Sequence, residues 1–61
     1  MTLKSNVLLR CYYEDGTEKD ITITVESLNE VDETSNIIEA ISELRSTEHY
    51  TRVKYMKKEA A

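Results

Sequence analysis

The segment spanning residues 7–25 is the part of this chain that most constrains its fold. Two runs of alternating apolar residues flank the turn sequence EDGT at residues 14–17. An Asp-Gly pair between such runs is a strong β-hairpin signal, because a tight turn needs a residue with positive φ and glycine adopts one without steric cost. The sequence therefore predicts a hairpin with strands over about residues 6–13 and 18–26.

The first predicted strand is apolar on both faces. One face carries Val7, Leu9, Cys11 and Tyr13, and the other carries Leu8, Arg10 and Tyr12. The second strand alternates cleanly, with Ile21, Ile23 and Val25 separated by threonines. A strand that is apolar on both faces is typical of the centre of a sheet and needs a cover on each side. A chain this short supplies one cover, so we expect a partner to supply the other.

A helix and a third strand follow the hairpin. Apolar residues at helical spacing predict a helix over about residues 35–45, and these are Ile37, Ile38, Ala40, Ile41 and Leu44. The polar segment before it holds a capping-box pattern at residues 27–30, which predicts one separate helical turn. The last strand is predicted over about residues 49–57, and residues 58–61 are expected to be frayed.

The predicted order of elements is ββαβ. A helical crossover between the second and third strands is expected to be right-handed and to make those strands parallel. The first strand then lies between them and antiparallel to both. The sequence therefore predicts a single domain over residues 1–61, an α+β two-layer sandwich. Its three-stranded antiparallel sheet has the order 2-1-3, and one helix covers one face.

Composition narrows the class of protein. Charged residues make up 33% of the chain and apolar residues 39%, a balance typical of a globular domain. No apolar run approaches the roughly 20 residues of a membrane span, and no signal peptide is recognisable. Cys11 is the single cysteine, which favours a reducing, cytoplasmic location and a place in the core.

The net charge of −4 is unevenly distributed along the chain. Eleven of the twelve acidic residues fall within residues 14–48, whereas both ends are basic. The first and last strands of the chain are predicted to be neighbours in the sheet. The face of the sheet without the helix should therefore be basic and aromatic. We predict a partner-binding surface there, formed by Leu8, Arg10, Tyr12, Tyr50, Arg52, Lys54 and Met56.

Several interpretations of this face compete. It can be an ordinary solvated surface in which long basic side chains cover apolar ones. It can also be a protein interface, since tyrosine, methionine and arginine are enriched in such patches. A third interpretation is a nucleic-acid platform, although an acidic protein repels polyanions at long range. Other candidate contacts are the free edge of the second strand and the acidic segment at residues 26–33.

Catalysis is not predicted. His49 is the lone histidine, and no nucleophile–base pair, zinc pattern or glycine-rich phosphate loop accompanies it. We therefore predict no enzyme activity, no cofactor and no metal. In size, acidity and lack of proline the chain is similar to accessory proteins of phages and mobile elements. The predicted function is a modulator that acts through protein contacts, as a homodimer; the alternative is a nucleic-acid-binding module.

Overall fold

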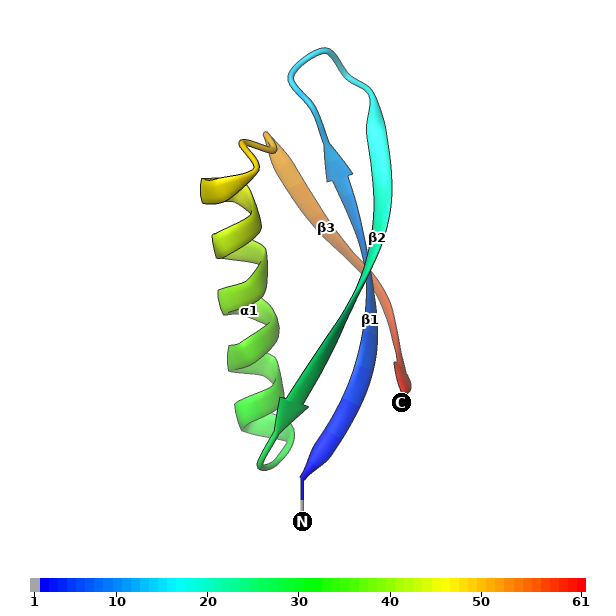
Figure 1. Cartoon of the computed structure of the whole chain (residues 1–61), viewed down its shortest axis with the longest axis vertical. Helices are drawn as coiled ribbons and strands as arrows, with labels where there is room; N and C mark the ends of the chain where they lie inside the picture. Colours follow the sequence, from blue (N-terminus) through cyan, green and yellow to red (C-terminus); the bar gives the residue numbers. More distant parts are fainter. Residues whose placement is uncertain (1) are drawn as a thin grey trace.

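The computed structural model describes residues 2–61, over which the chain forms a three-stranded antiparallel sheet with one helix on one face (Figure 1). The elements are β1 (Leu3–Tyr12), β2 (Glu18–Ser27), α1 (Glu30–Thr47) and β3 (Arg52–Ala60). Strand β1 lies in the centre, in the order β2-β1-β3. The predicted ββαβ fold and its sheet order are confirmed.

The β1–β2 hairpin closes through a glycine, as the sequence predicts. The Tyr13 amide donates to the Thr17 carbonyl at 2.8 Å, and the Gly16 amide donates to the Tyr13 carbonyl at 3.0 Å. Gly16 has a φ of 89°. Asp15 stabilises the loop by accepting from the Thr17 amide at 3.0 Å and its hydroxyl at 2.7 Å. This is the three-residue loop in which a glycine in the left-handed region closes the turn.

Helix α1 begins earlier than predicted. Asn29 is its N-cap, accepting from the Asp32 amide at 2.9 Å, while the Asp32 carboxylate accepts from the Leu28 amide at 2.8 Å. The acidic first turn, which includes Glu30, also complements the positive end of the helix dipole. These polar residues therefore extend the helix, and the prediction of a separate turn at residues 27–30 was wrong.

The end of α1 uses an unusual residue. The Glu48 amide donates to the Leu44 carbonyl at 3.0 Å, and the next residue, His49, has a φ of 59°. Glycine commonly occupies this left-handed position after a helix. The turn delays the following strand, so β3 starts at Arg52 rather than at residue 49.

Strand β3 contains an irregularity that changes which side chains share a face. Leu9 pairs with Tyr55 and Leu8 pairs with Lys57, which leaves Met56 as an extra residue. Beyond this bulge Lys58 pairs with Val7 on the helix side of the sheet. The prediction of a frayed tail was wrong, because β1 starts early enough to pair with β3 as far as Ala60.

The core is small for a chain of this length. Val7, Leu9 and Cys11 are completely buried, and Ile37 is nearly so. Half-buried apolar residues surround them: Ile21, Ile23, Val25, Ile41, Leu44 and Val53. The accessible surface is 4459 Å², against about 4,100 Å² for a compact protein of this mass. The radius of gyration is 12.0 Å, against about 10.5 Å for a compact domain. The single helix therefore leaves apolar surface uncovered on the elongated sheet.

Candidate protein-binding surfaces

The open face is the face of the sheet that points away from α1. Pairing and alternation place fourteen residues on it: Lys4, Asn6, Leu8, Arg10 and Tyr12 from β1, Glu18, Asp20, Thr22, Thr24 and Glu26 from β2, and Arg52, Lys54, Lys57 and Glu59 from β3. Five of the seven predicted contact residues lie here: Leu8, Arg10, Tyr12, Arg52 and Lys54. The structure thus brings most of the predicted set together.

Tyr50 does not belong to the open face, and its predicted placement was wrong. It is 8% exposed and lies before β3, with its ring centroid 5.2 Å from that of Tyr13 in an edge-to-face arrangement. Contact with Tyr13, burial and the nearby Cys11 raise the pKa of Tyr50. The alternation assumed from residue 49 fails because the left-handed turn at His49 precedes the strand.

Met56 lies at the bulge and has no pairing partner in β1. Lys57, which the prediction omitted, takes the position opposite Leu8. A bulge inserts one residue and shifts the alternation that follows it. Residues 54–58 alternate neither in charge nor in hydropathy. The sequence pattern therefore does not show at which residue the alternation shifts.

Two of the five cations on the open face, Arg10 and Lys57, are paired with carboxylates. Arg10 Nε lies 2.8 Å from Asp20 Oδ1, and its Nη2 lies 3.1 Å from Oδ2, a two-pronged contact. This hydrogen bonding raises the pKa of Arg10 and lowers that of Asp20. The Arg52 guanidinium lies 5.5 Å from the centre of the Tyr12 ring, within reach of a cation–π contact. The face carries five cations and four carboxylates, so it is nearly neutral rather than basic.

A groove between α1 and β3 exposes more apolar side chains than the open face does, and we call this groove and its rim the β3 flank. Its volume is about 290 Å³, and it is lined by Thr34, Ile37, Ile38, Ile41, Tyr55 and Lys58. Ile38 is 62% exposed and Tyr55 45%, and Val31, one turn beyond the groove, is 79% exposed. Contiguous exposed apolar side chains of this kind mark contact sites on small proteins. The sequence predicted all three isoleucines to lie in the core, which is confirmed for Ile37 and Ile41 and wrong for Ile38, so it gave no indication of this surface.

A second groove lies on the other side of the helix, between α1 and β2, and we call it the β2 flank. Its volume is about 370 Å³, and it is lined by Ile23, Thr24, Val25, Ala40, Glu43, Leu44, Thr47 and Glu48. Its apolar side chains are half-buried rather than exposed. Two carboxylates stand among them, which makes this flank acidic as well as apolar.

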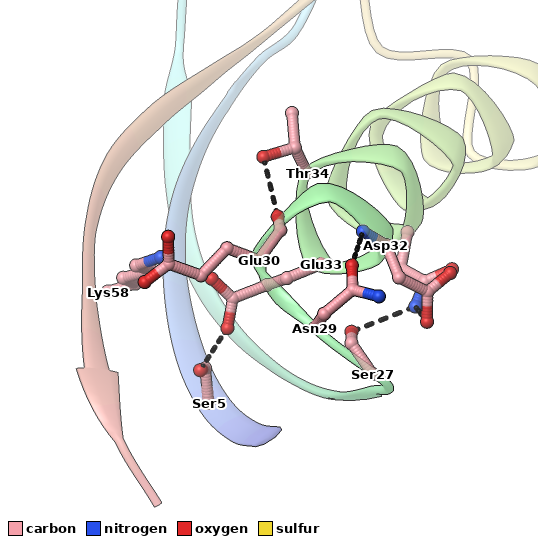
Figure 2. A network of polar contacts seen from close by, with 9 residues as sticks. Ser5, Ser27, Asn29, Glu30, Asp32, Glu33, Thr34 and Lys58 are labelled. Carbon is pink, nitrogen blue, oxygen red and sulfur yellow. Dashed lines mark hydrogen bonds and ion pairs between the residues drawn. The ribbon is translucent and has the colours of Figure 1, made fainter. Parts of the chain in front are cut away.

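A buried polar network fixes the first turn of α1 to the sheet (Figure 2). Glu33 is 3% exposed; its Oε2 accepts from the Ser5 hydroxyl at 2.6 Å, and its Oε1 accepts from Lys58 Nζ. These contacts, with Lys58 first, lower the pKa of Glu33, and the same carboxylate raises the pKa of Lys58. Part of the acidic segment at residues 26–33 therefore has an internal structural role.

Reactive groups are few in the part of the chain that the structure describes. Burial raises the pKa of the Cys11 thiol, which is completely buried. Among residues 2–61, no group of three or more His, Cys, Asp and Glu side chains is placed to hold a metal ion. Within the same residues, no helix is long and apolar enough to cross a membrane.

No protein family, curated protein or solved structure matches this chain. Its function must therefore be inferred from its own surfaces. The two flanks of α1 and the open face are the candidates.

Proposed function

We propose that this protein is a non-catalytic protein-binding module that works as a homodimer, with the β3 flank as the contact between its two copies. The observation that carries the proposal is Ile38, which is 62% exposed in the middle of α1 and lies beside Tyr55 over an apolar groove. Burial of apolar surface contributes about 25 cal/mol per Å². A second copy would supply the cover that the small core lacks.

Charge along α1 favours an antiparallel arrangement of the two helices. Val31, Ile38 and Arg45 recur every seven residues and share one stripe of the helix. Arg45 lies in the last turn and Glu30 in the first. A twofold axis beside Ile38 would bring each Arg45 to the first turn of the other copy, where opposite charges attract.

Such a contact would cover a modest part of the chain's surface. A standard interface buries about 800 Å² on each partner, roughly a fifth of the 4459 Å² that one chain exposes. Exposed apolar side chains extend the surface toward both ends of the groove, from Val31 to Tyr55. The open face and the outer edge of β2 would remain accessible for a target, as an accessory modulator requires.

Sedimentation equilibrium of the native chain tests this proposal. The expected particle mass is twice the 7.1 kDa of one chain. Ile38→Lys should give the mass of one chain, because it places a charge in the centre of the contact. Ser46→Lys adds the same charge at an exposed position on another side of α1 and should leave the mass doubled. A native particle of one chain mass, or an Ile38→Lys protein that is still dimeric, would contradict the proposal.

Nucleic-acid binding by the open face is the weaker candidate. Phosphates attract cations, whereas the open face carries four carboxylates beside its five cations, and two of those cations, Arg10 and Lys57, lie within 3.2 Å of a carboxylate. The carboxylates of β2 lie on the same face as these cations. A salt titration against a short oligonucleotide separates this role from protein binding, because binding to phosphates weakens steeply with added salt.

A further inference from the structure

We infer that the outer edge of β2 and the β2 flank together form a site for an extended, basic segment of a partner protein, which adds to the sheet as a fourth strand. The inference rests on the proposed function in that the protein acts by binding proteins. It uses the side of α1 opposite the proposed dimer contact, so each copy in a dimer would keep its own site.

The backbone of β1 shows which groups of β2 are available. The Thr51 amide donates to the Tyr12 carbonyl at 2.9 Å, and the Ala61 amide donates to the Lys4 carbonyl at 2.9 Å. The even-numbered residues of β1 thus direct their backbone groups toward β3. In an antiparallel pair, opposite residues either exchange both backbone bonds or exchange none. The β2 residues that lie opposite the even-numbered residues of β1 therefore direct their amide and carbonyl groups away from β1.

Thr22 and Thr24 are the central residues of this outward set, opposite Leu8 and Asn6. Their amide and carbonyl groups face the outer side of β2, where another strand can bond them. Native proteins protect such edges with proline, bulges or several lysines. Strand β2 has no proline, and its pairing with β1 is regular over ten residues. Its charged residues, Glu18, Lys19, Asp20 and Glu26, lie toward its two ends, and none lies between Ile21 and Val25.

The edge of β3 is protected in these ways. It carries Lys54, Lys57 and Lys58, and the bulge at Met56 interrupts its regular spacing. Strand addition is therefore favoured at β2.

The β2 flank gives the added strand a place for its side chains. Neighbouring strands lie about 4.8 Å apart, so a strand paired with β2 would direct alternate side chains toward α1. These would enter the groove beside Ile23, Val25 and Leu44, which are half-buried and apolar. Strand addition gains affinity from backbone hydrogen bonds and specificity from pockets for alternate residues.

Charge selects the chemistry of the segment. Glu43 and Glu48 line the groove, and no lysine or arginine does. Lys19 lies on the same face of β2 but four residues before Ile23, toward the hairpin. The site therefore suits valine- or isoleucine-sized side chains at alternate positions, with an arginine or lysine next to them. An acidic segment would meet repulsion at Glu43 and Glu48.

A synthetic probe tests the inference directly. The probe is a fluorescein-labelled heptapeptide with the order arginine, threonine, valine, threonine, valine, threonine, arginine, and fluorescence anisotropy measures its binding. Saturable binding is expected, and N-methylation of alternate amides of the probe should weaken it at least tenfold by removing backbone donors. Glu43→Lys combined with Glu48→Lys should weaken it by a similar factor, whereas Glu14→Lys in the exposed hairpin turn should not.

Amide shifts of ¹⁵N-labelled protein provide a measurement that needs no variant. The expected changes centre on Thr22, Thr24 and Leu44. No binding at about 1 mM protein, equal binding of the N-methylated probe, or shifts centred on β3 would each overturn the inference. Ile38→Lys separates the two proposals. A monomeric Ile38→Lys protein that still binds the probe shows that this site does not depend on the dimer contact, whereas a native dimer that does not bind the probe overturns this inference and leaves the dimer contact standing.

Discussion

Lys58 donates a hydrogen bond from Nζ to the buried carboxylate of Glu33, which lies twenty-five residues earlier in the chain. The same carboxylate accepts from the Ser5 hydroxyl. One charged group thus joins α1 to both the central strand and the last strand. It also anchors the N-terminal end of the β3 flank, because Lys58 lines that groove.

This pair predicts how stability depends on pH. The pKa of Glu33 is lowered from its ordinary value of 4.5, so the ionised carboxylate stabilises the folded state above about pH 4.5. That contribution is lost as the pH falls through the folded pKa. The pKa of Lys58 is raised from 10.5, so its contribution is present below that pH and is lost as the pH rises further. Urea unfolding between pH 3 and 11 should show both losses.

Glu33→Gln should separate this contribution from other acidic groups. Asp15 and Asp20 also have lowered pKa values, through Thr17 and Arg10, and add to the acid sensitivity of any variant. We expect Glu33→Gln to be clearly less stable than the native protein at pH 7, with a difference that shrinks below pH 4.5. Glu39→Gln, at an exposed position of α1, is the control. A difference that stayed constant with pH would mean that the charge of Glu33 does not stabilise the fold.

The left-handed turn after α1 gives a second prediction. A side chain in the left-handed region costs about 1–2 kcal/mol, and histidine tolerates it better than most. His49 has a φ of 59°, so His49→Gly should raise the free energy of unfolding by up to about 1 kcal/mol. His49→Val should lower it by about 1–2 kcal/mol, since β-branched residues are poorly accommodated there. A shift of 1 kcal/mol moves Tm by about 4–8 °C, and a His49→Gly protein that melts earlier than His49→Val would refute this account.

The fold was predictable because each of its elements has a local signal. The Asp-Gly turn fixes the hairpin, the alternation of Ile21, Ile23 and Val25 indicates a half-buried strand, and the apolar density of β1 identifies the centre of the sheet. Element boundaries were less predictable. The helix starts at Glu30 because Asn29 caps it, and the sequence offers several other cap candidates nearby.

The candidate surface was only partly predictable. Placing Arg10 and Tyr12 opposite the helix required no more than alternation along one strand. The same alternation, continued from Thr22, puts Asp20 and Glu18 on that face. The sequence therefore already contained the reason why the surface is not basic. The bulge at Met56 and the burial of Tyr50 had no such signal, because they follow from the β1–β3 pairing and from the turn at His49. The exposure of Ile38 had none either, because it depends on how much of the sheet the single helix covers.

The smallness of the core gives the last prediction. Leu9 is completely buried, and Leu→Ala at such a site costs about 2–5 kcal/mol. A domain of this length has a stability of only about 3–9 kcal/mol, so Leu9→Ala should unfold much of the population at 25 °C. Leu28 is 73% exposed, and Leu28→Ala should change stability by no more than about 0.5 kcal/mol. Circular dichroism and urea titration measure both.

Equal losses in the two variants would mean that Leu9 does not lie in the centre of the core. If the chain is a dimer, raising its concentration should partly restore Leu9→Ala, because association stabilises the folded state by mass action.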